Sequence, residues 1–327
     1  MKVAVDTSPL AQTRAGTARY LRGLLRALEA RADIEIRRVA FGGPGRAASL
    51  VRDAVWYPAG LPRAAEGADV LHCPTYRGPP RAKVPFVVTV HDLALFRHPD
   101  AFNRWSRVYG RPLVPRVLRA ARRVIAVSDF TRRELVEVVG LPEERIRVIP
   151  NAVGEPFVAD GPAADGDYVL TVGTLEPRKN LPRLVEAARR VGLELRVAGE
   201  RGWGGVTARG DGVTWLGWVP DDELARLYRG ARCVAYPSVY EGFGIPVLEA
   251  MACGAPVVTS RGAAMEEVTD GAAVLVNPLD PVEIAAGIER AAFEREELTR
   301  RGLERARAFT WSAVAEATTA VYREAAA

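Results

Sequence analysis

Short apolar runs alternate with amphipathic segments along the whole chain, and this alternation is typical of parallel sheets built from βαβ units. Strands are predicted at residues 3–5, 34–39, 70–71, 86–90, 124–127 and 147–149, and again at 168–172, 195–198, 213–216, 234–236, 256–259 and 273–276. Helices are predicted at 16–30, 103–121, 129–139, 180–191, 221–230, 246–253, 281–294 and 311–325. Because doubly wound sheets bind ligands beyond the carboxyl ends of their strands, we expect the loops that follow strands to carry the chemistry.

One segment breaks this rhythm and predicts two domains. Residues 156–167 are rich in proline, glycine and aspartate, so we expect a linker there. We expect a first Rossmann-like domain at 1–155 and a second at 168–308, and 327 residues are enough for two cores. A last helix is expected at 309–327, because its apolar residues recur every three or four positions.

Charge differs between the two halves. Residues 1–155 hold 26 lysines and arginines against 15 aspartates and glutamates, a net charge of +11, whereas residues 156–327 hold 19 against 25, a net charge of −6. A basic half suits an anionic partner such as a membrane leaflet or a phosphorylated acceptor, and we expect no nucleic-acid partner. The Arg-rich segment 104–123, with Trp105, Tyr109, Leu113 and Leu118, is the stretch that would face a membrane. The alternative is that these arginines form the solvated faces of ordinary packed helices.

The sequence shows no sign of secretion or of a membrane span. Its N-terminus lacks the basic and apolar regions of a signal peptide, and no run of about 18 apolar residues occurs. Cys73, Cys233 and Cys253 are widely spaced, as expected for buried thiols in a reducing compartment. We therefore expect a cytoplasmic protein, associated with the cytoplasmic face of a membrane if the basic half binds one.

The segment most informative about function follows a predicted strand of the second half. Gly242 and Gly244 let backbone N–H groups approach a ligand closely, and Pro246 suits the first position of a helix. The free N–H groups of such a first turn favour an anion, for example a diphosphate. Glu241 and Glu249 bracket this helix start, and sugar hydroxyls would offset their repulsion from a phosphate, because each such hydrogen bond is worth about 1.5–3 kcal/mol. The alternative is an ordinary turn with solvated glutamates.

This segment resembles the E-x7-E motif of family-4 retaining glycosyltransferases, with Glu241 and Glu249 at the two glutamate positions. The resemblance extends over essentially the whole chain. It implies the GT-B fold, in which two Rossmann-like domains face a cleft and a C-terminal helix crosses back to the first domain. It implies that Glu241 holds hydroxyls of the transferred sugar and Glu249 the ribose. The loop implied to line the sugar and diphosphate contains Gly242, Phe243, Gly244, Ile245 and Leu248.

A second segment, Gly-Thr-Leu-Glu-Pro-Arg-Lys-Asn at 173–180, follows the first strand of the second half and enters a helix. Relatives carry an arginine directly after the glycine and a lysine about five residues later. Lys179 occupies the lysine position, whereas Thr174 departs from the pattern, and Arg178 would supply the missing guanidinium. With Gly173, these residues are expected to bind the diphosphate. The alternative, surface cations at a helix start, is disfavoured by the helix dipole.

Three further loops carry candidate residues. His91 and Asp92 follow the predicted strand at 86–90, and the resemblance places the histidine near the reacting centre, with the aspartate orienting it or acting nearby. The alternative for the histidine is a purely structural role. Gly16 precedes a helix, where relatives place a glycine against the donor phosphate or the acceptor. The backbone at Val219 would meet the nucleobase.

The resemblance implies a retaining, metal-independent hexosyltransferase with His91, Asp92, Lys179 and Glu241 as catalytic residues. It would move a hexose from a nucleotide-diphosphate sugar, GDP-mannose first and UDP-glucose next, to a hydroxyl of a saccharide or lipid-linked acceptor. The segment 165–167 has the D-x-D form of a metal motif, but it precedes a strand, so we interpret it as a turn and expect neither metal nor cofactor. Two alternatives remain: a nucleotide-sugar epimerase of the same architecture, and a nucleotide-sugar-binding protein without catalysis.

Overall fold

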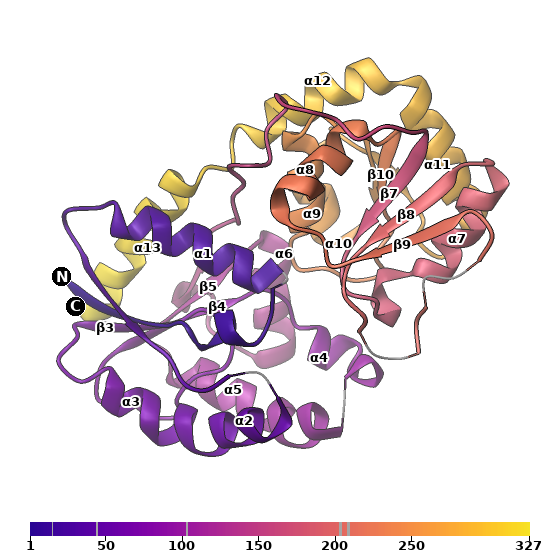
Figure 1. The fold of residues 1–327 in the computed structure, drawn as a ribbon. Coiled ribbons are helices and arrows are strands. Elements are labelled where there is room, and N and C mark those ends of the chain that lie inside the picture. Colours follow the sequence, from indigo (N-terminus) through magenta and orange to yellow (C-terminus); the bar gives the residue numbers. More distant parts are fainter. Residues whose placement is uncertain (15, 44, 103, 203–204, 208–209) are drawn as a thin grey trace. The chain divides into compact units, whose positions relative to one another are not determined.

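The computed structural model describes residues 1–14, 16–43, 45–102, 104–202, 205–207 and 210–327, and these residues form two units. Unit 1 contains residues 1–99, 103–152 and 311–327, and unit 2 contains residues 100–102 and 153–310. Each unit is a parallel sheet flanked by helices (Figure 1). The C-terminal residues therefore belong to the same unit as the N-terminus.

Unit 1 holds a six-stranded parallel sheet in the order β2-β1-β3-β4-β5-β6. Its strands are β1 (Lys2–Asp6), β2 (Glu35–Val39), β3 (Val70–Cys73), β4 (Phe86–Val90), β5 (Arg123–Ala126) and β6 (Ile146–Val148). Its α-helices are α1 (Gly16–Glu29), α2 (Arg46–Val51), α3 (Leu61–Ala64), α4 (Ala94–Arg97), α5 (Arg111–Ala120), α6 (Asp129–Glu134) and α13 (Trp311–Ala326). Three π-helical segments adjoin them: η2 (Arg52–Gly60), η4 (Ser106–Gly110) and η5 (Leu135–Val139).

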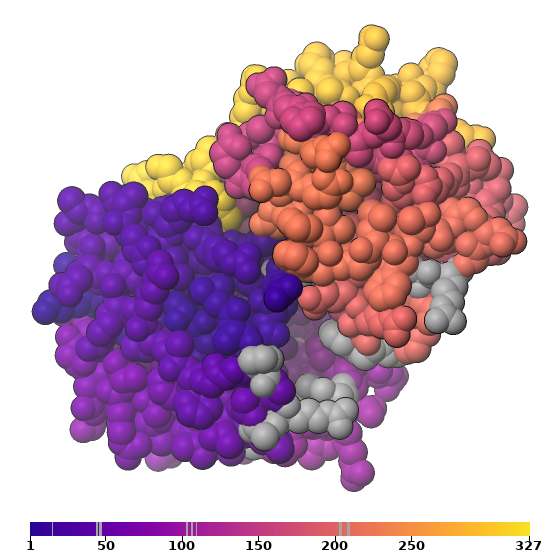
Figure 2. All heavy atoms as spheres, viewed as in Figure 1, coloured from indigo at the N-terminus to yellow at the C-terminus, as the bar shows by residue number. Residues whose placement is uncertain are grey.

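The C-terminal helix α13 completes the core of unit 1. Its residues Val321 and Tyr322 are buried in the same apolar cluster as the leucines of α1. A methyl group on Gly23 of α1 would lie 2.2 Å from the Trp311 ring, so the glycine makes room for the indole. Figure 2 shows the yellow C-terminal residues against the indigo N-terminal ones, in agreement with the contacts between α13 and α1. The predicted return of the last helix to the first domain is confirmed.

Unit 2 repeats the architecture with the strand order β12-β11-β10-β7-β8-β9, again all parallel. Its strands are β7 (Tyr168–Val172), β8 (Glu194–Ala198), β9 (Val213–Gly217), β10 (Cys233–Tyr236), β11 (Val257–Ser260) and β12 (Val274–Val276). Its helices are α7 (Leu181–Arg190), α8 (Asp221–Gly230), α9 (Ile245–Ala252), α10 (Ala263–Thr269), α11 (Pro281–Phe293) and α12 (Arg295–Ala306). Of the short 3-10 turns, η7 (Pro177–Lys179) lies in unit 2. Unit 1 contains η1 (Ser8–Ala11) and η6 (Glu143–Arg145), and η3 (Pro99–Ala101) has residues assigned to both units.

The predicted fold class is confirmed, and the differences from prediction concern helices. Each of the twelve predicted strands is present, and the residues of β4 and β7 are buried throughout, as expected for strands covered on both faces. The apolar pattern did not predict α2, α3, α4, α10 or α12. The predicted helix at 103–121 begins at a residue outside the described ranges, and its later residues divide into η4 and α5. Helix α5 continues through Pro115.

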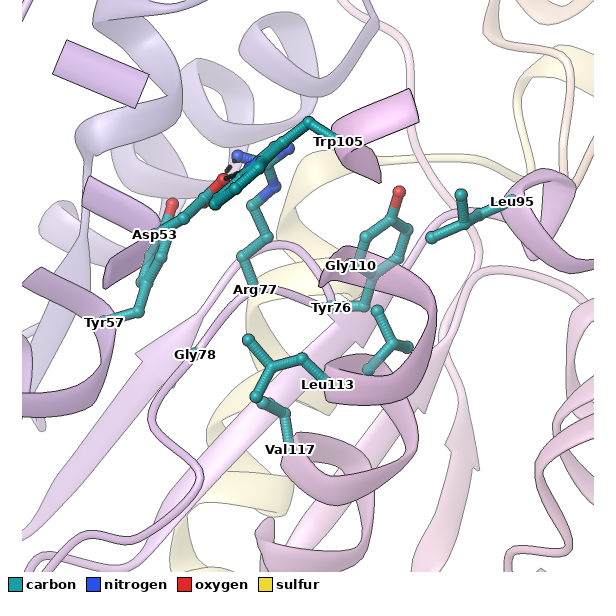
Figure 3. Close-up of a pocket in the computed structure, with 11 residues that line it drawn as sticks. Asp53, Tyr57, Tyr76, Arg77, Gly78, Leu95, Trp105, Gly110, Leu113 and Val117 are labelled. Carbon is teal, nitrogen blue, oxygen red and sulfur yellow. Dashed lines mark hydrogen bonds and ion pairs between the residues drawn. The ribbon is translucent and has the colours of Figure 1, made fainter. Parts of the chain in front are cut away.

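Several apolar residues of the Arg-rich segment 104–123 contact the interior of unit 1, whereas Val108 is 67% exposed. Leu118 is fully buried, Leu113 lines a cavity, and the Trp105 indole N–H donates a 3.0 Å hydrogen bond to Asp53 (Figure 3). These contacts favour a packed helix over a membrane-facing stripe. Within the described ranges, none of the helices combines the length and the apolar character needed to cross a bilayer.

Candidate functional site

The loop after β7 depends on a close approach between two backbone segments. Gly173 follows β7, and its amide N–H donates to the Ala198 carbonyl at 2.9 Å. Ala198 ends β8, and a methyl group on the following residue, Gly199, would lie 1.9 Å from the Gly173 carbonyl oxygen. Gly173 itself has a φ of +151°, and a methyl group there would lie 3.3 Å from Cε of Lys179. The two glycines therefore let the lysine side chain lie along the loop.

A tight turn then joins this loop to the one that follows β10. The turn η7 is followed by Asn180, which adopts a left-handed φ of 61° and precedes α7. The Asn180 side-chain amide donates to the Pro237 carbonyl at 3.0 Å, and the Val239 amide donates to the Arg178 carbonyl at 2.8 Å. Because β7 and β10 are neighbours in the sheet, their carboxyl-end loops meet, and these bonds fix their alignment.

The two loops bring four charged side chains into one cluster. Lys179 Nζ lies 2.6 Å from Oε1 of Glu241, and Arg178 Nη1 lies 2.9 Å from Oε2 of the same carboxylate. Arg178 Nη2 lies 2.8 Å from Glu176 Oε1. The Tyr236 hydroxyl donates to Glu241 at 3.1 Å and accepts from Lys179. Two cations thus balance two carboxylates, and all four side chains are at most 16% exposed.

Burial and pairing oppose each other in this cluster. Burial alone would raise the pKa of Glu241, but Arg178 and Lys179 outweigh it and lower that pKa to about 2. Burial lowers the pKa of Lys179, and Glu241 offsets only part of this effect. Burial likewise raises the pKa of Glu176 in spite of Arg178. Glu241 is therefore ionised at neutral pH, and its charge depends on both cations.

Helix α9 begins where the sequence predicted an anion-binding helix start. Gly244 adopts a left-handed φ of 92°, which places Ile245 as the first helical residue and Pro246 in the first turn. A methyl group on Gly244 would lie 2.4 Å from Cε of Met265. Phe243 is buried and packs edge-on against Phe309. The loop between Glu241 and the helix is thus held by packing on both sides.

Glu249 accepts a hydrogen bond from a residue outside the charged cluster. It is 2% exposed, and its Oε2 accepts a 3.0 Å hydrogen bond from the Tyr228 hydroxyl of α8. Leu248 is fully buried. Thr174 and Val219 are both partly buried, in the loops after β7 and β9.

His91, at the carboxyl end of β4 in unit 1, has a defined tautomer. Its Nε2 lies 2.9 Å from the Pro74 carbonyl oxygen, which only accepts, so Nε2 carries the proton and Nδ1 the lone pair. Burial lowers the pKa of His91, although Pro74 and Asp92 partly offset this. Asp92 uses Oδ1 to accept from the Ala94 amide at 3.0 Å, at the start of α4. Gly16 is the first residue of α1.

A chain of buried polar side chains connects α13 to His91. The Tyr322 hydroxyl bonds to His72 Nδ1 at 2.7 Å, and His72 Nε2 bonds to the Thr89 hydroxyl at 2.9 Å. The Tyr20 hydroxyl bonds to the same threonine at 3.1 Å, and its ring packs edge-on against His91 with centroids 4.8 Å apart. The histidine is thus supported by several strands and helices of unit 1.

The buried His72 predicts a pH dependence of stability. Burial lowers its pKa to about 3, whereas an unfolded histidine titrates near 6.5. Between these values the unfolded chain binds a proton that the folded one does not, so stability falls as pH falls, by about 1.4 kcal/mol per pH unit. Asp6, whose pKa is raised by burial to about 6, acts in the opposite direction between pH 6 and 3.8. Comparison with a His72→Gln variant isolates the contribution of His72 to this pH dependence.

We expect urea unfolding from pH 6.5 to 4.5 to give a shallower slope of stability against pH for His72→Gln than for the unmodified protein. Glutamine keeps hydrogen-bonding groups for Tyr322 and Thr89 but does not titrate. Equal slopes in the two proteins would show that His72 is not kept neutral by the fold.

Several residues of these arrangements were not predicted from sequence. Glu176 belongs to a predicted loop and Tyr236 ends a predicted strand, but only the neighbouring positions of β7 and β10 bring their loops together at Glu241. Tyr228 and Tyr322 lie on helices far from either motif, and no local pattern marks them. In the predicted turn at 165–167, Asp167 pairs with Arg232. Across the described ranges, no three His, Cys, Asp or Glu side chains converge in a way that would hold a metal ion.

Two protein families match this chain over adjoining segments. The family described as Glycosyltransferase Family 4 matches residues 14–154, and the one described as Glycosyl transferases group 1 matches residues 166–292. The O-antigen chain mannosyltransferase B of Escherichia coli is 34% identical over an alignment of 270 positions that covers 74% of this chain and 71% of that protein. The D-inositol 3-phosphate glycosyltransferase of Acidothermus cellulolyticus is 31% identical over an alignment of 279 positions that covers 74% of this chain but only 62% of that enzyme.

Solved structures share the fold over nearly the full chain. Sucrose-phosphate synthase from Thermosynechococcus elongatus superposes with a TM-score of 0.80 at 21% identity, covering 99% of this chain and 98% of that one. HepE from Anabaena, in complex with UDP and glucose, superposes with a TM-score of 0.76 at 18% identity, covering 98% of both chains. With its two parallel sheets and these relatives, the chain belongs to the group 1, or family-4, glycosyltransferases of the GT-B fold.

Proposed function

We propose that this enzyme transfers a hexose from a nucleotide-diphosphate sugar to a hydroxyl group with retention of configuration, and that unit 2 binds the donor. The observation that carries this proposal is the cluster of Glu241, Lys179 and Arg178. It lies at the carboxyl ends of two neighbouring parallel strands, where doubly wound sheets bind ligands. In addition, Oε2 of the buried Glu176 has no hydrogen-bond partner within the described residues, as expected beside a ligand site.

The cluster suggests how the leaving group is stabilised. Lys179 and Arg178 are both neutralised by carboxylates, so a diphosphate must share or replace these pairs when it binds. Glu241 would then turn its oxygens to the hydroxyls of the transferred sugar, and the two cations would face the phosphate oxygens. Negative charge grows on the diphosphate as the glycosyl bond breaks, so cations preorganised in a buried site lower the barrier.

Retention has two routes, and the side chains favour the one without a covalent intermediate. A nucleophilic route needs a free carboxylate beside the anomeric carbon. In the proposed donor complex the Glu241 oxygens bond to sugar hydroxyls, and Asp92 Oδ1 accepts the Ala94 amide at the start of α4. We therefore infer a front-face route, in which the departing diphosphate accepts the proton of the acceptor hydroxyl. His91, with Nδ1 as acceptor, would hold a sugar hydroxyl in place.

The remaining assignments are also proposals. Gly173, Thr174 and the start of α9 would meet the diphosphate, Glu249 the ribose and the Val219 backbone the nucleobase. GDP-mannose is the first donor to test, because relatives such as the O-antigen chain mannosyltransferase B of Escherichia coli carry mannosyl transfer in their names. UDP-glucose is the second, because HepE was solved with UDP and glucose.

We propose a saccharide or lipid-linked acceptor, as the names of the same relatives suggest. We also propose that the domain with residues 1–155 binds the acceptor, that residues 168–308 bind the donor, and that residues 156–167 are the linker between them. The net charge of +11 in residues 1–155 supports an additional anionic membrane surface at the cytoplasmic face. The inward contacts of Leu113 and Leu118 do not support it.

The test is a transfer assay followed by proton NMR. The protein is incubated with GDP-mannose or UDP-glucose and a panel of methyl glycosides, and the anomeric signal of the product is recorded. We expect a new glycoside whose anomeric configuration matches that of the donor. Inverted product would refute retention. An isomerised nucleotide sugar formed without any acceptor would instead establish the epimerase alternative, and donor binding without turnover would establish a binding protein.

A further inference from the structure

Unit 1 contains a small cavity that lies outside the motifs of the candidate site. It is lined by η2, the loop after β3, α4 and α5. Leu113 and Val117 form its apolar floor (Figure 3), and Leu95 and Val114 are further apolar lining residues. The enclosed volume is about 40 Å³. A water molecule needs about 10–15 Å³ on this measure, so the cavity has room for one small substituent of a few atoms, and a whole sugar ring must extend into the mouth.

The mouth of the cavity is polar but carries no net charge. Asp53 Oδ1 accepts from Arg77 Nη1 at 3.0 Å, and its Oδ2 accepts from the Trp105 indole N–H at 3.0 Å. The Asp53 side chain is only 10% exposed, whereas that of Arg77 is 36% exposed and Trp105 is 40% exposed. Figure 3 shows these three side chains converging on one side of the cavity. The arginine charge is thus already compensated, while parts of the Arg77 and Trp105 side chains are exposed.

One wall of the cavity carries a buried hydroxyl without a partner. Tyr57 is 2% exposed and lines the cavity, and its hydroxyl makes no hydrogen bond within the described residues. Native proteins leave few such groups unpaired, because each costs about 1–3 kcal/mol. A ligand that offers a hydroxyl to Tyr57 would remove this cost.

The chemistry of the occupant follows from these three features. A phosphate here would lie beside the buried Asp53 carboxylate, and Arg77 is the one cation among the described residues of the cavity lining, whereas the cluster in unit 2 offers two cations to a diphosphate. A purely apolar chain would leave the Tyr57 hydroxyl unpaired and would strip water from Asp53. A pyranose ring has an apolar face for the aromatic side chains and hydroxyls for the polar wall, and such mixed lining is typical of small-molecule sites. The cavity also lies at the carboxyl end of β3, where this fold class binds ligands.

We propose that this cavity and its mouth bind one neutral pyranose ring of the acceptor, with one substituent entering the apolar floor. The ring packs on Trp105, and its hydroxyls bond to Tyr57, Asp53 and Arg77. This assignment rests on the proposed glycosyltransferase function and narrows its acceptor from saccharides and phosphorylated molecules to uncharged sugar units.

The experiment measures sugar binding by saturation-transfer NMR in the absence of donor. The probes are methyl α-D-mannopyranoside, methyl α-D-glucopyranoside and methyl α-L-rhamnopyranoside, with mannose 6-phosphate as the charged comparison. The variants are Tyr57→Phe and Asp53→Asn. The control is Glu29→Gln, whose carboxylate pairs with Arg38 at 2.7 Å in the same unit but is not part of the cavity lining.

We expect at least one neutral probe to bind the unmodified protein. Tyr57→Phe should weaken that binding at least threefold and Asp53→Asn at least tenfold, while Glu29→Gln leaves it unchanged. The Tm of Tyr57→Phe should equal or exceed that of the unmodified protein, because the substitution deletes the unpaired hydroxyl. Three results would overturn the proposal: no binding of any neutral probe, unchanged binding in Tyr57→Phe, or tighter binding of mannose 6-phosphate that is lost in Arg77→Gln.

Measuring GDP and UDP affinity on the same samples separates this proposal from the proposed function. If sugar binding depends on Tyr57 and Asp53 but neither nucleotide binds the unmodified protein, the cavity is a saccharide site and the proposed transferase function fails. If a nucleotide binds equally well to all variants and no probe responds to them, the donor site stands and the cavity assignment fails.

Discussion

The Lys179→Met variant is expected to lose about two to three orders of magnitude in kcat, the effect typical of removing one group that stabilises charge in the transition state. Methionine keeps the length and apolar stem of lysine but removes the charge that would face the departing diphosphate. The buried Glu241 would then rely on Arg178 alone. The variant should also be less stable, since breaking a buried ion pair costs up to about 3–5 kcal/mol.

A double variant separates the loss of catalysis from the loss of stability. Lys179→Met combined with Glu241→Gln removes one positive and one negative charge from the cluster, so its net charge returns to zero. We expect the Tm of the double variant to exceed that of Lys179→Met, while its kcat stays as low or falls further. The exposed Lys83→Met is the matched control and should change neither quantity. A double variant that regained activity along with stability would mean that Lys179 acts only as a structural partner of Glu241.

Gly199→Ala is expected to destabilise unit 2 more than any other glycine-to-alanine change in the site loops. The added methyl group would lie 1.9 Å from the Gly173 carbonyl oxygen and 2.5 Å from its carbonyl carbon, and backbone cannot move aside as a side chain can. The loop after β7 must therefore shift, and it carries Arg178 and Lys179 toward or away from Glu241 as it does so. We expect a loss of at least about 3 kcal/mol in unfolding free energy, as for severe overpacking, together with a large loss of activity.

The control for this variant is Gly192→Ala. Gly192 also has a positive φ, +69°, but a methyl group there meets nothing within 4 Å. Its cost is therefore the backbone strain alone, about 1–2 kcal/mol. Thermal unfolding and initial rates of both variants make the comparison. Similar losses in the two proteins would contradict the proposed close approach between the loops after β7 and β8.

The sheet architecture could be predicted because parallel strands that are buried on both faces appear in the sequence as short, continuous apolar runs. β4, with the sequence Phe-Val-Val-Thr-Val, and β7, with Tyr-Val-Leu-Thr-Val, are apolar on both faces and are followed by polar loops. Helix α12 was missed because 7 of its 12 residues, Arg-Glu-Glu-Leu-Thr-Arg-Arg-Gly-Leu-Glu-Arg-Ala, are charged and few of them are buried. Helix α2 and segment η2 were missed because proline and glycine surround them, which suggests loops.

The site could be predicted as two motifs but not as one cluster. Glu241 and Lys179 were each recognised from their own loop, whereas their pairing depends on β10 lying beside β7, which the order of strands along the chain does not reveal. The same reason explains why Glu176 and Tyr236 were missed. The support of His91 by Tyr322 joins residues more than 200 positions apart, and only the packing of α13 in unit 1 brings them together.

Glu249 differs most from what its motif suggested. The resemblance implies a ribose ligand, and that role stays a prediction. In the structure the carboxylate is 2% exposed and bonded to Tyr228. A ribose would therefore have to approach a buried group that already has a hydrogen-bond donor, which the linear motif could not indicate.

The most direct test of the central claim, that Lys179 and its partners in unit 2 hold the donor diphosphate, is calorimetric titration with GDP and with UDP. We predict that at least one of them binds the unmodified protein and that Lys179→Met weakens this binding at least thirtyfold, or about 2 kcal/mol, while Lys83→Met leaves it unchanged. Equal affinity of the unmodified protein and Lys179→Met for the nucleotide would contradict the claim.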